Sequence, residues 1–328
     1  MKVRENCSLL SYNTFGMDVQ AKVVAEYASV EELIDLLKTY KGERLLAVGE
    51  GSNLLFTKDF DGVILVSRMC RARALKETDK EVWIEAESGL RLDSLIEQLV
   101  DMNLMGMENL SYIPGTVGAS AVQNVGAYGV EAKDVIESIE TIEIASLRTR
   151  AFNNKECRFG YRDSIFKKEL QGQYIVTKVV YRLQKEGELH PERLKIDKPN
   201  CTVSDIREAV IAIRKSKLPE VSELSSAGSF FKNPVVSQEH YQTLLQHYPD
   251  MPHYIQEDGV KIPAAWLIEQ CGWKGKMQGG AQVYEKQPLV IVNANHATPE
   301  DIMTLAQAVC DSVQKTFGIT ISPEVNYI

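Results

Sequence analysis

The segment SAGSFFKNP (226–234) places Ser229 directly after a glycine and just before two aromatic residues and a lysine. A serine in this setting could act as a nucleophile, a phosphate ligand, a proton donor or a turn residue. A nucleophilic serine needs a base, but the chain has no G-x-S-x-G elbow and no histidine in the ten residues before Ser229. Triad chemistry therefore has little support, and the other three roles stay open.

A glycine-rich stretch, GEGSNLLF (49–56), follows the short apolar run LLAV. Its two glycines would let the backbone approach a ligand, and Ser52 and Asn53 add polar groups. This composition suits a pyrophosphate, which needs a cup of N–H donors. Leu54 stands where the dinucleotide fingerprint requires its third glycine, and another strand follows instead of a helix. A Rossmann site is therefore not expected, and a plain tight turn remains an alternative.

A second stretch, IPGTVGASAVQNVGAYG (113–129), contains four glycines and three alanines and almost nothing bulky before Tyr128. Residues this small bury little side-chain area, so they favour close approach of the backbone to a flat, extended ligand. A helix beginning near Gly115 would direct its free N–H groups at a phosphate. Close helix packing through small residues is the alternative.

The composition is that of a soluble globular enzyme with more than one domain. The 328 residues exceed the roughly 250–300 at which a single core stops growing. Hydrophobic residues make up 44% and charged residues 25%, which is usual for soluble proteins. The net charge of −8 argues against nonspecific binding to nucleic acid or anionic membranes. No apolar leader and no apolar run of about 18 residues occurs, so we expect a cytoplasmic protein with no membrane association.

Cysteine and histidine do not form metal-binding patterns. The cysteines are scattered without a C-x-x-C pair, and the five histidines never approach H-E-x-x-H spacing. We therefore expect reduced thiols and no metal ion. The six cysteines are Cys7, Cys70, Cys157, Cys201, Cys271 and Cys310.

Apolar periodicity and capping residues predict three long helices. The first begins with a capping box of Ser29 and Glu32, and the last begins at a threonine cap and ends before Gly318. Their ranges are 29–40, 204–217 and 298–317, and shorter helices are expected at 91–101, 237–248 and 262–271.

Alternating or β-branched runs predict the strands that accompany these helices. The strands do not alternate strictly with helices, so the sequence favours an α+β architecture over a doubly wound parallel sheet. The predicted strands are 44–48, 62–67, 81–88, 138–145, 173–183 and 288–293. The polar segment 184–202 is expected to form an excursion loop, a feature that is often functional.

Six motifs in this order resemble the UDP-N-acetylenolpyruvoylglucosamine reductase family, usually called MurB. The resemblance covers the chain from about residue 9 to its end and is far more specific than either glycine-rich stretch alone. The motifs are GEGSNLLF, IPGTVGASAVQNVGAYG, FGYRDSIFK (159–167), KLP (217–219), AGSFFKNP (227–234) and PEVNYI (323–328).

The resemblance implies a two-domain FAD-binding module of the vanillyl-alcohol-oxidase type and a third, α+β substrate-binding domain. This family reduces FAD with NADPH and then passes hydride to the enolpyruvyl group of UDP-N-acetylglucosamine enolpyruvate. The product is UDP-N-acetylmuramate, a peptidoglycan precursor. The expected segments are 1–70 and 71–203 for FAD, 204–217 as a connecting helix, 218–318 for the substrate and 319–328 returning to the active site. We expect a monomer.

By the same resemblance, both glycine-rich stretches hold FAD. The implied FAD-binding residues are Gly49, Glu50, Gly51, Ser52, Asn53, Leu54, Leu55, Pro114, Gly115, Thr116, Gly118, Ala119, Ser120, Gln123, Asn124, Gly126, Ala127 and Tyr128.

The resemblance also assigns the chemistry that the substrate needs. Hydride addition to the enolpyruvyl β-carbon leaves an enolate, whose carboxylate needs cations or donors and whose α-carbon needs a proton. Arg162 would bind the carboxylate with a fork of two hydrogen bonds. Glu324, as a protonated acid, would share the developing charge, and Ser229 would supply the proton. The implied substrate contacts are Lys217 and Asn233 to the diphosphate, with Tyr161 and His190 near the substrate.

Two positions depart from the family pattern. The 184–202 loop matches the long-loop form, in which a tyrosine closes over the substrate, but the nearest aligned residue is His190. Asn326 stands where some members carry arginine. The contact that closes over the substrate would therefore have to come from His190. One contact to a phosphate or carboxylate would be weaker or would come from another residue.

Two alternative functions remain. A different flavoprotein of the same fold, such as an oxidase of small alcohols or sugars, would lack the diphosphate contacts Lys217 and Asn233. A non-catalytic nucleotide-sugar binder would need no arginine, serine and glutamate gathered from three distant segments.

Overall fold

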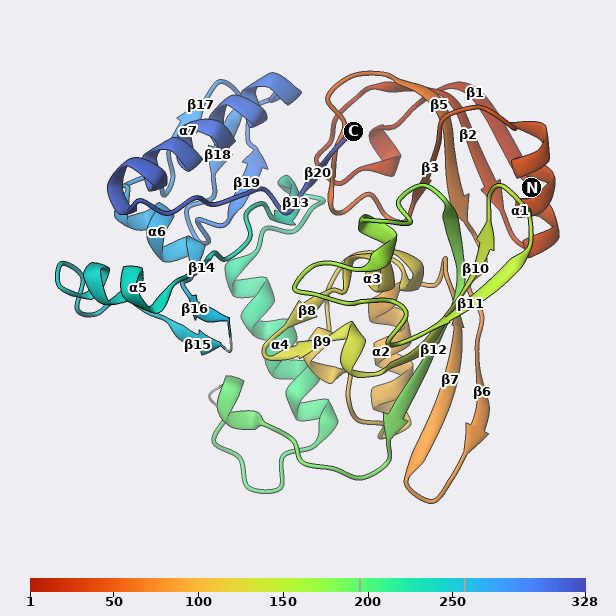
Figure 1. Ribbon diagram of the computed structural model, residues 1–328, viewed down its shortest axis with the longest axis horizontal. Helices are drawn as coiled ribbons and strands as arrows, with labels where there is room; N and C mark the ends of the chain where they lie inside the picture. The colour runs from red at the N-terminus through yellow and green to blue at the C-terminus, as the bar shows by residue number, and fades with distance from the viewer. Residues whose placement is uncertain (195, 257) are drawn as a thin grey trace. The chain divides into compact units, whose positions relative to one another are not determined.

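The computed structural model describes residues 1–194, 196–256 and 258–328 and divides the chain into two compact units (Figure 1). Unit 1 comprises residues 1–7, 20–50 and 60–214. Unit 2 comprises residues 8–19, 51–59 and 215–328. Two of the five points at which the chain passes from one unit to the other lie between Glu50 and Gly51, inside the first glycine-rich stretch, and between Arg214 and Lys215, in the last turn of a long helix.

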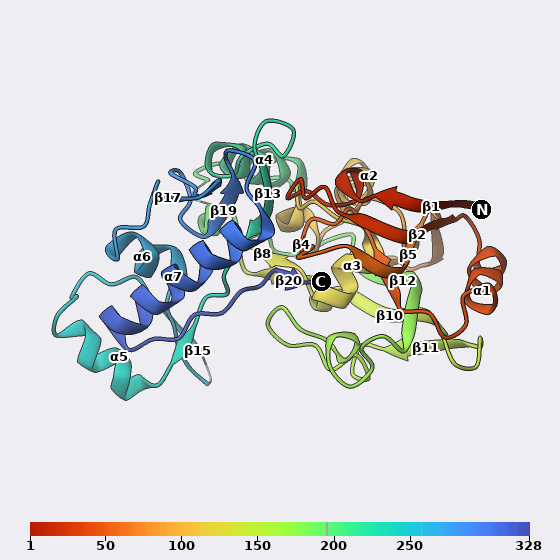
Figure 2. The ribbon, with the colours of Figure 1, turned by 90° about the horizontal axis from the view of Figure 1, so that it is seen from above.

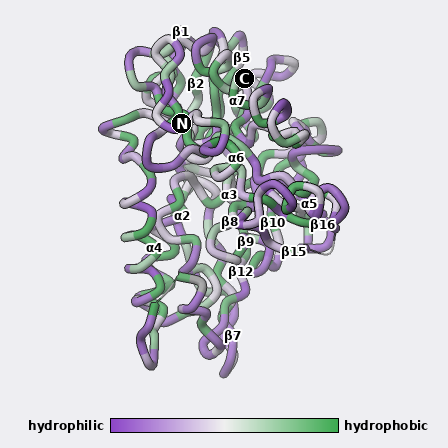
Figure 3. Tube along the Cα trace, turned by 90° about the vertical axis from the view of Figure 1, so that its left-hand side faces the viewer, coloured by the Kyte–Doolittle hydropathy of each residue, from purple (hydrophilic) through white to green (hydrophobic). Residues whose placement is uncertain are grey.

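The first sheet of unit 1 has three mutually parallel strands and one helix packed against it. Its order is β1-β2-β5-β3, with β2, β5 and β3 parallel. The apolar side chains of β2, β5 and α1 form one buried cluster, and the trace of β5 is largely hydrophobic (Figure 3). The elements are β1 (Lys2–Ser8), β2 (Gln20–Tyr27), α1 (Val30–Thr39), β3 (Leu45–Val48) and β5 (Phe60–Ser67).

The cap of α1 follows the prediction in one half only. Ser29 accepts a hydrogen bond from the Glu32 N–H at 3.2 Å, as predicted. The Glu32 carboxylate accepts from the Ala28 N–H at 2.8 Å instead of returning to Ser29. The reciprocal half of the capping box is therefore shifted by one residue, and it satisfies the backbone just before the cap.

The second sheet of unit 1 is antiparallel, with the order β11-β10-β12-β7-β6. Helices α2 and α3 contribute to the buried core that this sheet forms, and Figure 1 shows both helices on the same side of it. The elements are β6 (Ala72–Glu77), β7 (Glu81–Glu87), α2 (Leu92–Asp101), α3 (Val117–Gln123), β8 (Gly126–Ala127), β9 (Val130–Glu131), β10 (Ile136–Glu143), β11 (Thr149–Asn153) and β12 (Tyr174–Gln184), with 3-10 turns at Glu108–Leu110, Ala132–Asp134, Ile165–Lys167 and Pro191–Leu194.

Helix α4 (Val203–Lys217) is fixed to α2 by an ion pair. Two nitrogens of the Arg207 guanidinium bind the two Asp93 oxygens at 2.6 and 3.1 Å. The Tyr112 N–H also donates to Asp93 at 2.6 Å. Burial opposes ionisation of this carboxyl, but the Arg207 pair and the Tyr112 N–H outweigh burial and lower the pKa of Asp93. The partners at this contact are thus charged and mutually satisfied, which holds α4 in place.

Unit 2 centres on the sheet β13-β19-β18-β17, against which α7 packs (Figure 2). Helix α7 has the predicted Thr298 cap, Pro299 in its first turn and a left-handed Gly318 at its end. The elements are β13 (Ser225–Ser229), β17 (Met277–Gln278), β18 (Ala281–Val283), β19 (Val290–Asn293) and α7 (Pro299–Phe317), a small sheet of β14 (Val235–Val236), β16 (Gly259–Lys261) and β15 (Tyr254–Gln256), helices α5 (Gln238–Leu245) and α6 (Ala264–Gln270), the 3-10 turn Leu10–Tyr12, and β20 (Asn326–Tyr327) parallel to β4 (Leu54–Leu55).

Every helix and strand predicted from the sequence is present within a few residues of its predicted ends, and the α+β class is confirmed. The sequence did not indicate that residues 8–19 and 51–59 belong with the C-terminal part of the chain. The finer division into five segments stays a prediction. Among the described residues, no helix combines the length and the apolar character that crossing a membrane requires. The same ranges contain no group of three or more histidine, cysteine or acidic side chains that could hold a metal ion.

Candidate active site

Ser229 is turned outward by a bulge at the end of β13. The pairing of β13 with β19 is irregular between Ser226 and Ser229, and Gly228 lies between them with φ +67°. A Cβ added at Gly228 would meet no atom within 4 Å, so the backbone angle and not lack of space requires glycine here. Bulges of this kind re-aim a side chain, and Ser229 is exposed although the next two residues are buried.

The buried neighbours of Ser229 are aromatic and fix the strand end. Phe230 and Phe231 are 0% and 1% exposed, and their rings meet edge to face with centroids 5.1 Å apart. Phe230 also packs edge to face on Phe15 and against Tyr327. These contacts agree with the expectation that the two phenylalanines serve packing and not chemistry.

Unit 2 brings Glu324 next to the Ser229 strand. The Glu324 N–H donates to the carbonyl oxygen of Phe230 at 2.7 Å. Phe231 and Pro323 form an isolated bridge beside this bond. Two of the three residues predicted to be catalytic, Ser229 and Glu324, are therefore held one residue apart across a backbone hydrogen bond, although 95 positions separate them in the sequence.

Residues 51–53 of the first glycine-rich stretch have unpaired backbone donors. Among the hydrogen bonds of the described residues, none is donated by the backbone N–H groups of Gly51, Ser52 or Asn53. Gly51 is a buried residue, so its unpaired donor is costly without a ligand. Successive unpaired N–H groups are the donors from which phosphate-binding concavities are built. This stretch therefore fits the pyrophosphate of a dinucleotide cofactor.

Gly51 is required by its surroundings as well as by its backbone angle. It has φ +67°, and a Cβ at this position would lie 2.0 Å from the carbonyl oxygen of Tyr12. The Gly51 carbonyl in turn accepts from the Thr14 N–H at 3.4 Å. Segment 8–19 thus packs against the loop at Gly51, a role that the sequence alone did not indicate.

We expect Gly51→Ala to destabilise the protein by more than 2 kcal/mol, because a left-handed alanine alone costs roughly 1–2 kcal/mol and the clash with Tyr12 adds to this. Gly42→Ala is the matched control: Gly42 has φ +89° and nothing within 4 Å of its Cβ position. The free energy of unfolding from denaturant titration measures both changes. Equal destabilisation of the two variants would show that Tyr12 does not constrain the loop.

The first half of the stretch is anchored in unit 1. The Glu50 carboxylate accepts from the Gly115 N–H at 2.6 Å and from Arg91 Nε at 2.8 Å. A Cβ on Gly49 would lie 2.7 Å from the Thr116 hydroxyl, so a larger residue here would force the Thr116 side chain to move. The two glycine-rich stretches therefore meet in unit 1 at Glu50 and Gly115, as expected for parts of one cofactor site.

The helix expected to point at a phosphate begins with two N–H groups that are already paired. Helix α3 begins at Val117 instead of near Gly115 and has only seven residues. Its first two N–H groups, of Val117 and Gly118, donate to the carbonyls of Leu90 and Ser88 at 2.8 and 3.0 Å. The expectation that these donors are free was wrong, because the neighbouring backbone already satisfies them.

Several polar side chains of this second stretch are buried and engaged within the protein. Ser120 donates to the Val117 carbonyl, and Gln123 accepts from Lys167 Nζ at 2.5 Å. Asn124, fully buried, bonds the Gly160 carbonyl and the Lys133 N–H at 2.8 and 2.9 Å. These contacts tie α3 to the chain around Gly160. The predicted contacts of these three residues with the cofactor stay predictions. Their side chains would have to make those contacts in addition to the hydrogen bonds described here.

Tyr128 occupies the tip of the β8–β9 hairpin in a left-handed conformation. Tyr128 and Gly129 have φ +49° and +82°, the positive angles of a two-residue hairpin turn. A tyrosine in this region is uncommon and marks a functional candidate. Its ring packs on the buried cluster that includes Ile206 and Val210 of α4. Burial raises the pKa of the Tyr128 hydroxyl, and the positive charge of Arg214 opposes that shift.

Arg162 also lies at a strained turn position. Gly160 and Asp163 exchange two backbone hydrogen bonds of 3.0 and 3.1 Å, which leaves Tyr161 and Arg162 as the loop. Arg162 has φ +56°, at a position where glycine or asparagine is usual. This strain makes Arg162 a functional candidate on structural grounds alone.

The guanidinium of Arg162 is held against the β8–β9 hairpin. It donates to the Gly126 carbonyl, lies 3.7 Å from a Glu131 oxygen and stacks 4.9 Å from the centre of the Tyr161 ring. Its side chain is only 17% exposed. Unit 1 therefore gathers Tyr161, Arg162 and Gly126 of the predicted site.

Lys217 and Asn233 both lie in unit 2. Lys217 is the exposed last residue of α4. The Asn233 side-chain oxygen accepts from the N–H of Ala264, the first residue of α6, at 2.9 Å. This bond fixes the orientation of the amide and gives Asn233 a structural role beside its predicted contact with a diphosphate.

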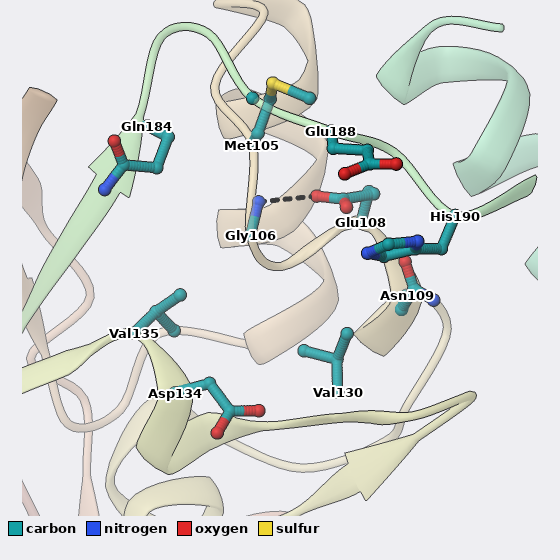
Figure 4. A pocket seen from close by; sticks show the side chains of 11 residues that line it. Met105, Gly106, Glu108, Asn109, Val130, Asp134, Val135, Gln184, Glu188 and His190 are labelled. Carbon is teal, nitrogen blue, oxygen red and sulfur yellow. Dashed lines mark hydrogen bonds between the residues drawn. The ribbon is translucent and has the colours of Figure 1, made fainter. Parts of the chain in front are cut away.

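His190 lines a pocket of about 280 Å³ in unit 1. Figure 4 shows its ring pointing into this pocket beside Glu108 and Asn109. One ring nitrogen lies 3.2 Å from the Glu192 carboxylate, and the side chain is 42% exposed. Glu108, Asp134 and Glu188 line the same pocket together with apolar residues such as Met105 and Val130. The predicted part of His190 in closing over the substrate stays a prediction.

Sequence comparison assigns the chain to one family over its whole length. A family model described as UDP-N-acetylenolpyruvoylglucosamine reductase, C-terminal domain, matches residues 220–328, and one described as FAD binding domain matches residues 21–146. A reductase of this name from Flavobacterium johnsoniae is 43% identical, with 100% of each chain covered. One from Bacteroides fragilis is 46% identical over 99% of this chain and 100% of its own.

Comparison with solved structures supports the same fold. The MurB structure from Thermus caldophilus has a TM-score of 0.71 and 23% identity, and the match covers 100% of this chain and 99% of that one. A solvent-stable cholesterol oxidase has a TM-score of 0.53 at 11% identity, with 98% of this chain and 86% of that chain covered. The expected flavin-binding fold of the vanillyl-alcohol-oxidase type is thus confirmed. With relatives this similar over its full length, the chain belongs to the UDP-N-acetylenolpyruvoylglucosamine reductase family.

Proposed function

We propose that this protein reduces the enolpyruvyl group of UDP-N-acetylglucosamine enolpyruvate to UDP-N-acetylmuramate, with NADPH as reductant and FAD as cofactor, in peptidoglycan precursor synthesis. The observation that carries the proposal is the convergence of Ser229 and Glu324 at one backbone hydrogen bond in a chain that matches reductases of this name from end to end. The alkene carboxylate of this substrate needs the proton donor and the charge partner that such a pair supplies.

FAD fits the two glycine-rich stretches. The unpaired N–H groups of Gly51, Ser52 and Asn53 suit its pyrophosphate. Gly49, Gly115 and the backbone near Tyr128 are proposed to contact FAD as well. When bound, FAD supplies the hydride that it receives from NADPH. The role of these residues is to bind the cofactor and to exclude water from it.

The other residues of the proposed site bind the substrate or take part in its reduction. Arg162 binds the substrate carboxylate and exchanges its contacts with Gly126 and Glu131 for this anion. Ser229 gives a proton to the α-carbon, and Glu324, as a protonated carboxylic acid, donates a hydrogen bond to the developing negative charge. Lys217 and Asn233 bind the diphosphate, and Tyr161 and His190 border the substrate.

The organisation of the chain follows from these roles. Residues 1–70 and 71–203 bind FAD, 204–217 connect, 218–318 bind the substrate and 319–328 carry Glu324 to it. We further propose a monomer that works in the cytoplasm, where NADPH and nucleotide sugars are made. An oxidase of small alcohols is not favoured, because the likeness to cholesterol oxidase is one of fold alone, at 11% identity.

Product analysis tests this function directly. The purified protein, loaded with FAD, is incubated with NADPH and UDP-N-acetylglucosamine enolpyruvate, and the sugar nucleotide is examined by mass spectrometry. We expect one NADPH to be consumed for each product molecule that has gained two hydrogens. NADPH consumption without this product would contradict the assignment of the substrate.

A further inference from the structure

Residues 322–328 form an extended segment, here called the C-terminal clip, that lies between the Ser229 strand and the first glycine-rich stretch. On one side the clip bonds to the residues just after Ser229. The Lys232 N–H donates to the Ser322 carbonyl at 2.9 Å, and the Glu324 N–H donates to the Phe230 carbonyl at 2.7 Å. This side fixes the position of Glu324 along the strand.

The other side of the clip bonds to residues 53–57. The Asn326 N–H and the Asn326 side-chain amide both donate to the Asn53 carbonyl, at 3.0 and 3.2 Å. The Asn53 amide reaches back to the Glu324 carbonyl at 3.4 Å. The peptide groups on either side of Glu324 are therefore held from two directions, by Phe230 and by Asn53.

The end of the clip repeats this attachment. The Ile328 N–H donates to the Leu55 carbonyl at 3.0 Å. The N–H and the hydroxyl of Thr57 donate to the Ile328 carbonyl oxygen at 3.0 and 2.8 Å. These bonds make β20 and β4 a parallel ladder of only two residue pairs. So short a ladder is marginal by itself and depends on the order of the chain that carries it.

The same loop carries the unpaired donors of Gly51, Ser52 and Asn53. Without an anion these donors favour loop conformations that reach water, and with a pyrophosphate they favour the one conformation that binds it. Asn53 belongs to both systems: its N–H is one of the unpaired donors, and its carbonyl and amide hold the clip.

We propose that Asn53 and Asn326 are positioning residues that couple the binding of FAD to the placement of Glu324. The inference rests on the proposed function only in taking FAD as the ligand of this loop. Binding of FAD orders the loop and thereby docks the clip, and a docked clip strengthens FAD binding by the same factor, because coupling between two sites is reciprocal.

Asn326→Ala tests the coupling, with Ser322→Ala as the matched control. Ser322 is an exposed residue of the same clip whose backbone contact survives the change. FAD affinity is measured by titrating the apoprotein and following flavin fluorescence, and clip docking by hydrogen exchange of residues 321–328 with and without FAD. We expect FAD to slow exchange in the parent and in Ser322→Ala. In Asn326→Ala we expect FAD binding about two- to ten-fold weaker, the value of one lost hydrogen bond, and a smaller slowing of exchange.

Measuring the two half-reactions separately distinguishes a loss of Glu324 positioning from a general loss of enzyme activity. Asn326→Ala at saturating FAD should retain flavin reduction by NADPH and slow reoxidation by the enolpyruvyl substrate, because Glu324 acts only on the substrate. Equal slowing of both, or parent-like affinity, exchange and rates, overturns the proposal. Thr57→Val, which removes only the hydroxyl bond to Ile328, gives the same test if Asn326→Ala does not fold. A parent protein that binds no FAD would instead refute the proposed function itself, and the coupling with it.

Discussion

Ser229→Ala is expected to leave reduction of bound FAD by NADPH unchanged and to slow its reoxidation by the enolpyruvyl substrate about 10²- to 10⁴-fold. Ser229 is exposed at the end of β13, and the bulge at Gly228 turns it away from the buried Phe230. Its hydroxyl is a very weak acid, so it serves as a donor only toward a strongly basic enolate. Reduction by NADPH generates no such carbanion on the substrate, and the two half-reactions should separate.

Rapid-mixing absorbance at the flavin bands measures each half-reaction on its own. Ser225→Ala, four residues earlier on the same strand, is the matched control and should behave like the parent in both. If Ser229→Ala slowed the two half-reactions equally, the serine would be a structural or cofactor residue. If it slowed neither, another group would have to donate the proton.

Arg162→Lys is expected to slow substrate reduction about 10²- to 10³-fold, the usual effect of removing one preorganised donor to a developing charge. Lysine keeps the positive charge but presents a point charge instead of the planar fork that matches a carboxylate. Because lysine also has a Cβ, the backbone strain at φ +56° is unchanged, and the fold should persist. The rate loss should therefore come without unfolding, and FAD reduction by NADPH should be retained.

Arg158→Lys is the control for this variant. Arg158 lies in the same segment with φ +44° and pairs with Glu169, but its side chain is 66% exposed. Steady-state rates with the enolpyruvyl substrate and circular dichroism compare the two variants. Similar rates for Arg162→Lys and Arg158→Lys would remove Arg162 from the carboxylate site.

Local signals explain why the long elements could be predicted from the sequence. The periodicity and caps of α1, α4 and α7 are properties of about twenty neighbouring residues, so tertiary context changed only details such as the partner of Glu32. The six motifs located the candidate site for the same reason, since each is contiguous. Gly228 before Ser229 was a readable signal of a bulge, although its meaning emerged only with the register of β13.

Contacts between distant segments could not be predicted in this way. Asn53 and Asn326 lie 273 residues apart and join two strands of two residues each, which have no periodicity to detect. The same holds for Thr14, whose hydroxyl bonds the Ser226 carbonyl at 2.6 Å and ties segment 8–19 to the Ser229 strand. The expectation of free N–H groups near Gly115 failed for a related reason. The carbonyls of Leu90 and Ser88, which accept hydrogen bonds from the start of α3, belong to another part of the chain.

An anaerobic spectral titration tests the central claim most directly. NADPH is added to the FAD-loaded protein without oxygen, and UDP-N-acetylglucosamine enolpyruvate follows. The account predicts that NADPH bleaches the flavin bands and that the sugar nucleotide restores them, one equivalent for one. Bands that bleach but recover only when air is admitted would contradict the assigned substrate, and a protein that stays colourless with added FAD would contradict the cofactor as well.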